Sequence, residues 1–488
     1  MECCEMNKRG FGKVEKIVTR SLPRYYSENK KARLYYVKHW QSAKIKEKTI
    51  LYEVRDGQSM TDSPLALFLY IVAQPEFKDW QHVWVVRSES VKNELLVNIP
   101  EKFHDLITYV VRDSVDYSKW LLAAKYLITN STFNFFWHKR PGQIYINTWH
   151  GTPLKYMGYD IPGNKTSLKN VQRNLLMTDF LISPNKHTTH IFFDRYKLNG
   201  LYEGQILESG YPRNDVLQKR DATIKDQLIE AGLVLLNKPI VLYTPTWKGT
   251  SINNPAGSLE QIYSEVMYLQ SKHPDLQILL KVHPYAYQQA KSYEKLRKLL
   301  IPDQFDPGRV LSITDILITD YSSIFFDFEI TERPIIFYTW DKEQYQNYRG
   351  MYFEDDELPG PVLDSIKDVS DYLSRVKNIK QTSQYSGRKL MTSHDDGQVT
   401  KRIVNRIFKK INDDKISDIT TVEKKKKILI FSGGMVNNGI SSSLINLTKN
   451  IDYGKYDVSI LAYDSNQTEK VNLSLIHISE PTRRVVIS

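Results

Sequence analysis

Short apolar runs alternate with amphipathic stretches along most of this 488-residue chain. The runs are rich in Val, Ile, Leu and Tyr and have the length of buried strands, whereas the stretches between them repeat apolar residues at helical spacing. Residues 1–48 are instead polar and rich in Lys, Arg and Tyr, without clean periodicity. From residue 49 onward the alternation predicts an α/β protein with parallel sheets and crossover helices.

The predicted elements fall into two blocks. The first block has strands at Ile50–Val54, His82–Val86, Leu106–Val111, Tyr126–Thr129, Ile144–Thr148 and Phe180–Ser183, with helices at Pro64–Ala73 and Tyr117–Ala124. The second has strands at Ile240–Thr244, Gln277–Val282, Val310–Ile313, Ile316–Thr319 and Ile335–Tyr338, with helices at Ser258–Ser271, Gln288–Leu300 and Ser323–Ile330. Two such blocks of similar size predict two doubly wound domains that face each other across a cleft.

The segments around these blocks predict the domain organisation. We expect a basic N-terminal extension at 1–48, a first domain at 49–212, a second at 213–411, a linker at 412–427 and an incomplete α/β unit at 428–472. The linker is polar and ends in four lysines, and a buried strand, a glycine-rich turn and a helix follow it. Residues 473–488 resemble a translated sequencing adapter, so we expect a truncated reading frame that ends in non-native read-through.

The amino-acid composition restricts the cellular compartment of the protein and the kinds of partner that suit it. Cys3 and Cys4 are adjacent and are the only cysteines, which excludes a disulfide framework and predicts a reducing, cytoplasmic environment. The longest apolar stretch, Pro64–Ala73, is about half of the ~20 residues that span a bilayer, and no apolar signal core follows the first basic residues. The net charge of +11 suits nucleic acid, phospholipid headgroups or a phosphate-rich substrate, but composition alone favours a well-solvated surface.

Two loops that follow predicted strands carry histidines. His150 is followed by Gly151 and Thr152, whose backbone N–H groups are exposed, and a neutral imidazole there can accept a proton from an attacking hydroxyl. The alternative is a structural histidine that caps the next helix. Lys281 and His283 share one face of their strand, and a cation beside an imidazole suits a phosphate. Here the alternative is a surface lysine with a packed histidine.

Two further loops offer hydroxyl groups. Pro245 and Thr246 follow a strand of the second block, and an ordinary strand-to-loop junction explains them as well as a ligand site does. Ser322 and Ser323 open a helix directly after a strand, so that their hydroxyls, the unpaired N–H groups and the helix dipole form an anion site. Asp327 lies one helical turn later on the same face. An N-cap with an exposed acid is the alternative, but the pattern favours phosphate binding.

Taken together, these motifs resemble a known family. They are His150–Lys155, Gly210–Asp215, Thr244–Trp247, Lys281–Pro284 and Thr319–Asp327, with closing segments at Arg349–Phe353 and Asp396–Gln398. Their combination and order over residues 49–410 resemble the CDP-glycerol glycerophosphotransferases, which are the teichoic acid primases and polymerases of Gram-positive cell walls. The resemblance implies a GT-B fold, in which an acceptor-side Rossmann-like domain faces a nucleotide-binding one.

The resemblance also implies the ligand contacts. CDP-glycerol would contact His150, Gly151, Thr152, Pro153, Leu154, Arg213, Pro245, Thr246, Lys281, Val282, His283, Ser322, Ser323 and Asp327. Lys248 and Lys281 stand where relatives commonly have Arg, which keeps the charge but loses the bidentate fork. The sequence has no acidic cluster with metal-ligand spacing, so we expect neither a metal nor another cofactor. The unit from Lys427 resembles the start of a second GT-B glycosyltransferase.

The expected reaction is transfer of glycerol phosphate from CDP-glycerol to a hydroxyl of a lipid-linked teichoic acid chain, with release of CMP. His150 would be the general base, whereas His283, Lys281 and the Ser322–Ser323 helix end would bind the pyrophosphate, and Arg213 would close over the nucleotide. A ribitol phosphate transferase or a nucleotide-sugar glycosyltransferase with the same site is the alternative. A non-catalytic basic protein that binds nucleic acid or lipid is the contrasting class, and the four loops argue against it.

The expected location is the cytoplasmic face of the cell membrane. A lipid-anchored polyanionic acceptor requires the enzyme to reach an anionic surface, where each basic residue contributes ~1 kcal/mol. The Lys, Arg, Tyr and Trp residues of 1–48, for example Arg33–Trp40, would supply a peripheral docking surface. A solvated N-terminal extension is the alternative. Whether the enzyme would be a primase or a polymerase is left open by the sequence.

Overall fold

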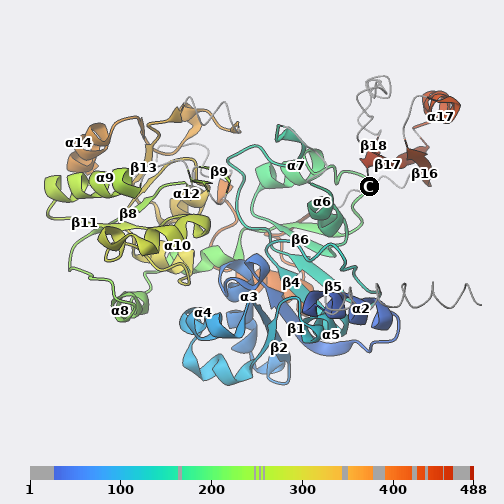
Figure 1. Cartoon of the computed structure of the whole chain (residues 1–488), viewed down its shortest axis with the longest axis horizontal. Helices are drawn as coiled ribbons and strands as arrows, with labels where there is room; N and C mark the ends of the chain where they lie inside the picture. Colours follow the sequence, from blue (N-terminus) through green and yellow to red (C-terminus); the bar gives the residue numbers. More distant parts are fainter. Residues whose placement is uncertain are drawn as a thin grey trace, which may run out of the picture.

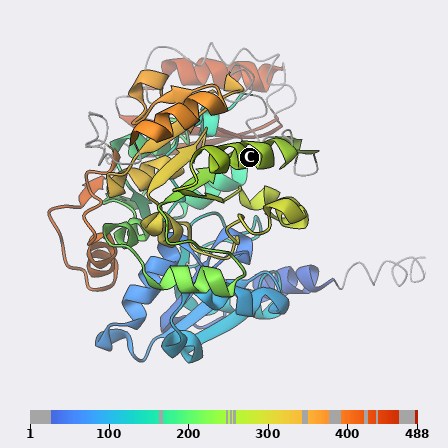
Figure 2. The ribbon, with the colours of Figure 1, turned by 90° about the vertical axis from the view of Figure 1, so that its left-hand side faces the viewer.

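Two α/β domains lie next to each other, and a small third sheet follows them in the chain (Figure 1). The computed structural model describes residues 27–162, 168–246, 249–251, 254–255, 259–342, 350–376, 391–419, 426–434, 438–453, 455–464 and 484–487. Figure 2 turns the molecule, so that the first domain, in blue, lies below the green and yellow elements of the second.

The first domain contains an eight-stranded sheet in the order β15-β7-β6-β5-β4-β1-β2-β3. Its strands are β1 (Lys46–Glu53), β2 (Gln81–Val86), β3 (Ile107–Val111), β4 (Ala124–Thr129), β5 (Ile144–Asn147), β6 (Phe180–Ser183), β7 (Gln205–Glu208) and β15 (Ser417–Ile419). All neighbours run parallel except β15, which pairs antiparallel with β7. This order confirms the predicted parallel sheet of the first block.

Side chains that alternate along these strands fill two cores, one on each face of the sheet. Tyr52 on β1 lies opposite Trp84 on β2, and their rings stack at 4.9 Å on the face covered by α3 (Asp62–Val72). Leu51 and Val83 point to the other face, which is covered by α2 (Glu28–His39) and α5 (Val115–Ala123). This domain also contains the helices α4 (Lys92–Leu95), α6 (Lys169–Leu176) and α7 (Lys186–Asp194).

The second domain contains five parallel strands in the order β11-β8-β12-β13-β14. They are β8 (Ile240–Thr244), β11 (Gln277–Leu280), β12 (Ile316–Thr319), β13 (Ile335–Tyr338) and β14 (Val362–Leu363). The helices are α8 (Thr223–Glu230), α9 (Leu259–Lys272), α10 (Pro284–Ser292), α11 (Pro307–Ile313), α12 (Ile324–Phe328) and α14 (Ile366–Val376). A short hairpin, β9 (Gly249–Ser251) and β10 (Asn254–Pro255), follows β8.

One predicted element of this domain is wrong, and the bounds of another are shifted. Val310–Ile313, predicted as a strand, lies in helix α11, because Asp306 accepts the N–H of Arg309 at 3.2 Å as an N-cap and Pro307 occupies the first helical turn. A short apolar run fits either a strand or one face of a buried helix. The helix predicted at Gln288–Leu300 is α10, which begins earlier at Pro284 and ends at Ser292.

The chain returns to the first domain after its second sheet. Helix α16 (Val399–Phe408) buries Ile403 and Ile407 in the same core as α3, although the sequence places it within the second block. Asp215, in the 3-10 helix η8 (Pro212–Gln218), accepts the N–H groups of Val399 at 3.0 Å and Thr400 at 2.8 Å, which caps α16. Strand β15, from the segment predicted as a linker, completes the first sheet.

The third sheet has three parallel strands in the order β16-β17-β18. Strand β16 (Lys426–Gly434) leads into helix α17 (Gly439–Asn450) and then into strand β17 (Tyr456–Asp464), with β18 (Arg484–Ile487) beside it. Asn438 caps α17 by accepting the N–H of Ser441 at 2.9 Å. This order confirms the predicted strand, helix and strand, whereas the predicted glycine-rich turn includes residues 435–437, which lie outside the described residues.

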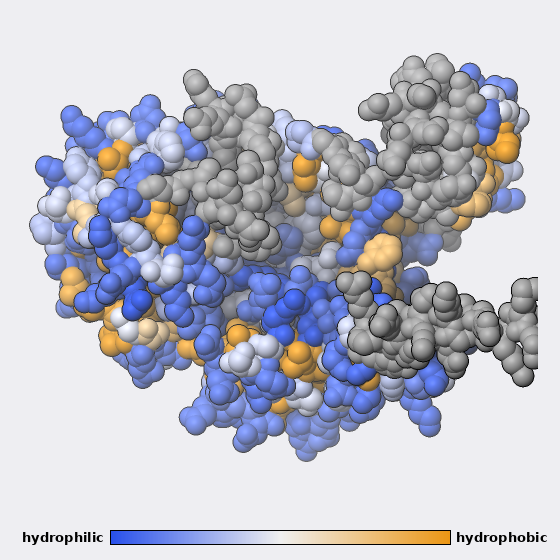
Figure 3. All heavy atoms as spheres, viewed as in Figure 1, coloured by the Kyte–Doolittle hydropathy of each residue, from blue (hydrophilic) through white to orange (hydrophobic). Residues whose placement is uncertain are grey.

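The surface in Figure 3 is mostly hydrophilic, with apolar residues scattered over it. Across the described ranges, no helix combines the length and the apolar character that a bilayer span requires.

Candidate active site

A cavity of about 640 Å³ lies between the two domains. Loops at the carboxyl ends of β1, β4 and β5 form one wall, and loops after β8, β11 and β12 form the other. Ligands of α/β proteins bind at this end of the strands. Of the predicted site residues, the cavity is lined by His150, Gly151, Thr152, Pro153, Leu154, Arg213, Pro245, Thr246, Lys281, Val282, His283, Ser322 and Ser323, but not by Asp327.

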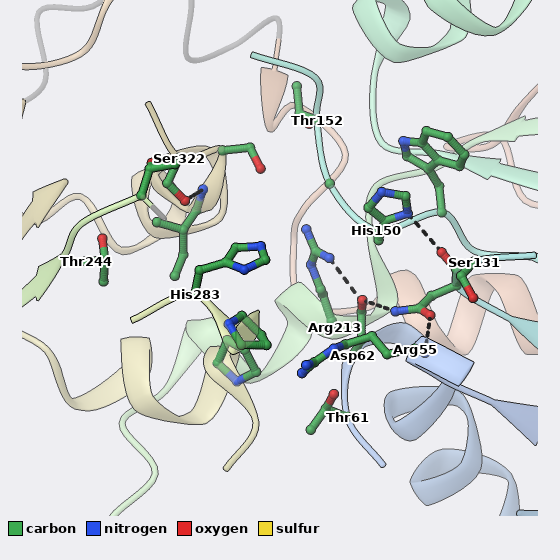
Figure 4. A pocket seen from close by; sticks show the side chains of 18 of the residues that line it. Arg55, Thr61, Asp62, Ser131, His150, Thr152, Arg213, Thr244, His283 and Ser322 are labelled. Atoms are coloured by element: carbon green, nitrogen blue, oxygen red, sulfur yellow. Dashed lines mark hydrogen bonds and ion pairs between the residues drawn. The ribbon is translucent and has the colours of Figure 1, made fainter. Parts of the chain in front are cut away.

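His150 lies on the wall of the first domain, across the cavity from His283 (Figure 4). Its Nδ1 lies 2.9 Å from the carbonyl oxygen of Asn130. Because a carbonyl only accepts, Nδ1 carries the proton in the neutral ring and Nε2 holds the lone pair. The side chain is exposed to the cavity, but the protein atoms around the cleft reduce its solvation and lower the pKa of His150, so the neutral ring can accept a proton at pH 7.

The loop after His150 is held by helix α7. Asn185 donates from Nδ2 to the hydroxyl of Thr152 at 3.1 Å, and the carbonyl of Pro153 accepts from His187 at 2.8 Å. Gly151 has a φ of +153°, and a Cβ there would lie 3.2 Å from the hydroxyl oxygen of Ser323. Glycine therefore permits the two domains to approach closely at this point.

Lys281 and His283 form the cationic part of the opposite wall. Both follow β11, and Val282 between them is buried in the core, as strand alternation predicts. Burial lowers the pKa of Lys281, and no hydrogen bond or ion pair of its amine is seen among the described residues. His283 is exposed to the cavity, but reduced solvation within the cleft, with Arg55 and Lys155 nearby, lowers its pKa to about 4, so this ring is also neutral at pH 7.

The remaining predicted loops supply hydroxyls and N–H groups. Thr246 donates its N–H to the two carboxylate oxygens of Asp320, at 2.9 and 2.8 Å, and its hydroxyl contacts the same carboxylate. Ser322 accepts the N–H of Ile324 at 3.4 Å, and Ser323 stands at the start of α12. Lys248 and Arg349, which the sequence also highlights, lie outside the described residues.

Asp327 lies behind the cavity wall, where it pairs with Arg213. The guanidinium of Arg213 lies 2.9 Å from Asp327 and 3.1 Å from Asp62, and all three side chains are largely buried. Burial opposes the charge on Arg213, but Asp327 and Asp62 together raise its pKa. The same guanidinium lies over the ring of Tyr211 at 4.5 Å. Arg213 therefore links α3 of the first domain to α12 of the second.

Several cavity residues have no counterpart among the sequence motifs. The carboxylate of Asp62 accepts a hydrogen bond from the side-chain amide of Asn130 at 2.7 Å. Asn130 in turn orients His150 through its carbonyl, so Asp62 connects Arg213 to His150. Arg55 reaches Asp303 on the opposite wall. Arg55 and Asp62 lie between β1 and the start of α3, and Asn130 and Asp303 lie in two other loops. None of these residues belongs to a sequence motif, and only the positions of Arg55 and Asn130 directly after predicted strands could have indicated them.

Two Rossmann-like domains that present strand ends to a shared cavity define a GT-B type of fold. Residues 34–409 match the family model described as CDP-Glycerol:Poly(glycerophosphate) glycerophosphotransferase. The chain therefore belongs to this family of transferases. Among the described residues, no group of three His, Cys, Asp or Glu side chains is placed to hold a metal ion.

Characterised relatives agree with the family assignment. The chain is 32% identical over 349 residues to a teichoic acid poly(glycerol phosphate) polymerase of Bacillus spizizenii, which covers 69% of this chain and 85% of the relative. It is 31% identical over 388 residues to a teichoic acid glycerol-phosphate transferase of Staphylococcus aureus, and this match covers 75% of this chain and 95% of the relative. A solved structure of the wall teichoic acid polymerase TagF, soaked with CDPG, matches with a TM-score of 0.66 and 27% identity, covering 83% of this chain and 98% of that one.

The ion pairs of Arg213 predict a large stability effect. Arg213→Met leaves Asp62 and Asp327 buried without a cation, so we expect the free energy of unfolding to fall by about 3–5 kcal/mol. Arg220→Met is the control, because Arg220 pairs with Asp315 at the surface and its loss costs at most about 1 kcal/mol. Chemical denaturation measures both. Equal losses for the two variants would contradict the role of Arg213 as a buried link.

Proposed function

We propose that this enzyme transfers glycerol phosphate from CDP-glycerol to the terminal hydroxyl of a lipid-linked poly(glycerol phosphate) acceptor and releases CMP. The observation that carries the proposal is the placement of His150, whose Nε2 lone pair faces a cavity with Lys281 and His283 on its other wall. Membership of the glycerophosphotransferase family supports the choice of donor.

The cavity walls suit an in-line displacement at phosphorus. The acceptor oxygen forms a bond to the phosphorus that carries glycerol, while the bond from that phosphorus to the bridging oxygen breaks. CMP leaves with the bridging oxygen and its electron pair, and the hydroxyl proton passes to Nε2 of His150. Such a transition state needs positioning and charge stabilisation more than covalent help from the protein.

The second wall stabilises the charge that develops on CMP. Lys281 presents its amine to this wall, and neutral His283 supplies a directed N–H donor. Donors that are held in place before the reaction lower the barrier, because they need not reorganise as charge moves to the leaving oxygen. The hydroxyls and N–H groups around Ser322 and Ser323 add further donors.

A nucleotide-release assay tests the donor. We expect CMP release from CDP-glycerol that depends on a polyol phosphate acceptor, because the cavity combines a base with an anion wall. CDP-ribitol tests the alternative polyol, and UDP-sugars test the glycosyltransferase alternative. Release of a uridine nucleotide with a UDP-sugar, and none with CDP-glycerol, would contradict the proposal.

The two histidines are expected to have separable effects. His150→Ala should lower transfer by about 10²–10⁴-fold with most CDP-glycerol affinity retained, because only the proton acceptor is lost. His283→Ala should weaken both donor binding and turnover, since the donor phosphates are charged in the ground state and in the transition state. His190→Ala is the control, because His190 is exposed and pairs with Asp194. Isothermal titration and initial rates separate binding from turnover.

The pH profile distinguishes a base from a structural histidine. Because the pKa of His150 lies below the usual 6.5, kcat/KM should rise with pH through one limb below that value and stay level at neutral pH. His283→Ala should keep the limb, whereas His150→Ala should lose it. An unchanged limb in His150→Ala, or a near-normal rate, would contradict the assignment.

We also propose that the enzyme associates peripherally with the anionic cytoplasmic face of the membrane. Helix α2 buries Ala32 and Tyr36 against the first domain and exposes Leu34 and Val37, which are 55% and 70% accessible. Lysines and an arginine surround this apolar pair on the same helix. A combination of exposed apolar and basic side chains suits a membrane interface that carries anionic lipids.

Vesicle co-sedimentation tests this surface. Leu34→Glu combined with Val37→Glu should reduce binding to phosphatidylglycerol vesicles, because it replaces apolar contact with two negative charges. Ile229→Glu, on the exposed face of α8, is the control. Binding of the wild-type protein should also fall at high salt. Unchanged binding of the double variant would contradict the role of α2.

A further inference from the structure

Arg55 occupies a strained turn at the carboxyl end of β1. Arg55, Asp56 and Gly57 have successive φ values of +47°, +57° and +78°. Left-handed backbone is costly for the two residues that are not glycine, and it persists only where the surroundings enforce it. The N–H of Arg55 donates to the side chain of Asn130 at 3.3 Å, and the Arg55 side chain lines the cavity (Figure 4).

The guanidinium of Arg55 makes a loose contact across the cleft. Its two terminal nitrogens both lie 3.4 Å from a single oxygen of Asp303, whereas charge-assisted N–H···O bonds are usually 2.7–2.9 Å long. The Arg55 and Asp303 side chains remain 30% and 23% accessible. The buried pairs of Arg213 are shorter, and its side chain is only 13% accessible. Arg213 is therefore a permanent link, while the Arg55 pair is easily exchanged.

The surroundings of Arg55 carry more positive charge than Asp303 balances. Arg55 lies close enough to Lys281 and His283 to lower the pKa of both groups. Three further carboxylates line the cavity, and each has partners of its own. Asp56 pairs with Arg112 at 2.8 Å, Asp62 pairs with Arg213 at 3.1 Å, and Asp306 accepts the N–H groups of Asp62 at 2.8 Å and Arg309 at 3.2 Å. An arginine and a lysine that converge from opposite walls favour a ligand with more than one negative charge.

We propose that Arg55 binds the pyrophosphate of the donor from the first domain, opposite Lys281 and His283, and that Asp303 holds the guanidinium only until the donor enters. This inference rests on the proposed function, because it assumes a pyrophosphate ligand. A phosphate offers the planar guanidinium a bidentate partner, which the single oxygen of Asp303 does not. In this exchange Arg55 releases one anion and binds another.

The proposal predicts opposite effects for the two partners of this pair. Arg55→Ala should lower kcat/KM for CDP-glycerol by about ten- to a hundredfold, because a charge-assisted contact to the phosphate is lost. Asp303→Asn should tighten CDP-glycerol binding by up to about fivefold, because it removes a weak competitor for the guanidinium. Arg55→Lys should recover only part of the loss, since an ammonium lacks the fork.

Arg87→Ala is the matched control. Arg87 also belongs to the first domain, but it pairs with Asp113 at 3.7 Å, is 55% accessible and lies outside the cavity. Its removal should leave kcat/KM within about twofold. Thermal unfolding of every variant checks that the fold is intact. A structural pair would predict weaker binding for both Arg55→Ala and Asp303→Asn, and that result would overturn the proposal.

Inorganic pyrophosphate separates this inference from the proposed function. Isothermal titration with pyrophosphate should show weaker binding to Arg55→Ala and tighter binding to Asp303→Asn than to the wild-type protein. If the wild-type enzyme releases no CMP from CDP-glycerol, the proposed function fails, while the pyrophosphate titrations still test Arg55. If the wild-type enzyme is active and Arg55→Ala keeps its activity within twofold, the role of Arg55 is overturned and the proposed function stands.

Discussion

The buried ion pairs of Arg213 are the interaction on which the site depends. A guanidinium that leaves water must be surrounded by acceptors, and here Asp62 of the first domain and Asp327 of the second supply them. Asp62 also accepts from Asn130, whose carbonyl fixes the tautomer of His150. The ion pairs that join the domains therefore also help to fix the orientation of the His150 ring, the proposed base.

The cleft controls the chemistry of its histidines through solvation. Removing an imidazole from water disfavours its charged form, so the pKa values of His150 and His283 both lie below the usual range. A neutral ring can accept a proton or donate a directed hydrogen bond at neutral pH, whereas a charged ring could not act as a base. The basic residues that line the cavity are Arg55, Lys155, Lys281 and Arg213, of which Arg213 is balanced by Asp62 and Asp327.

Two kinds of contact between the domains coexist in this fold. The ion pairs of Arg213 with Asp62 and Asp327 are buried, so they hold the second domain against the first. The contact between Arg55 and Asp303 is long and partly accessible. The two kinds of contact differ in their access to water, because the ion pairs of Arg213 are more deeply buried than the pair of Arg55 with Asp303.

The sequence by itself determined most of the strands of the two large sheets and the loops with the histidine motifs, because period-two alternation and the residues that end a strand are local properties. It did not reveal the short strands β7, β14 and β15. It did not determine that Val310–Ile313 is helical, since a short apolar run becomes a strand or a helix according to its neighbours and caps. Only the tertiary structure decided that Asp327 lies behind the cavity wall, whereas Asp62 and Arg55 line the cavity. Their partners are distant in the chain, and a charge takes its role from the groups that folding brings within a few ångströms.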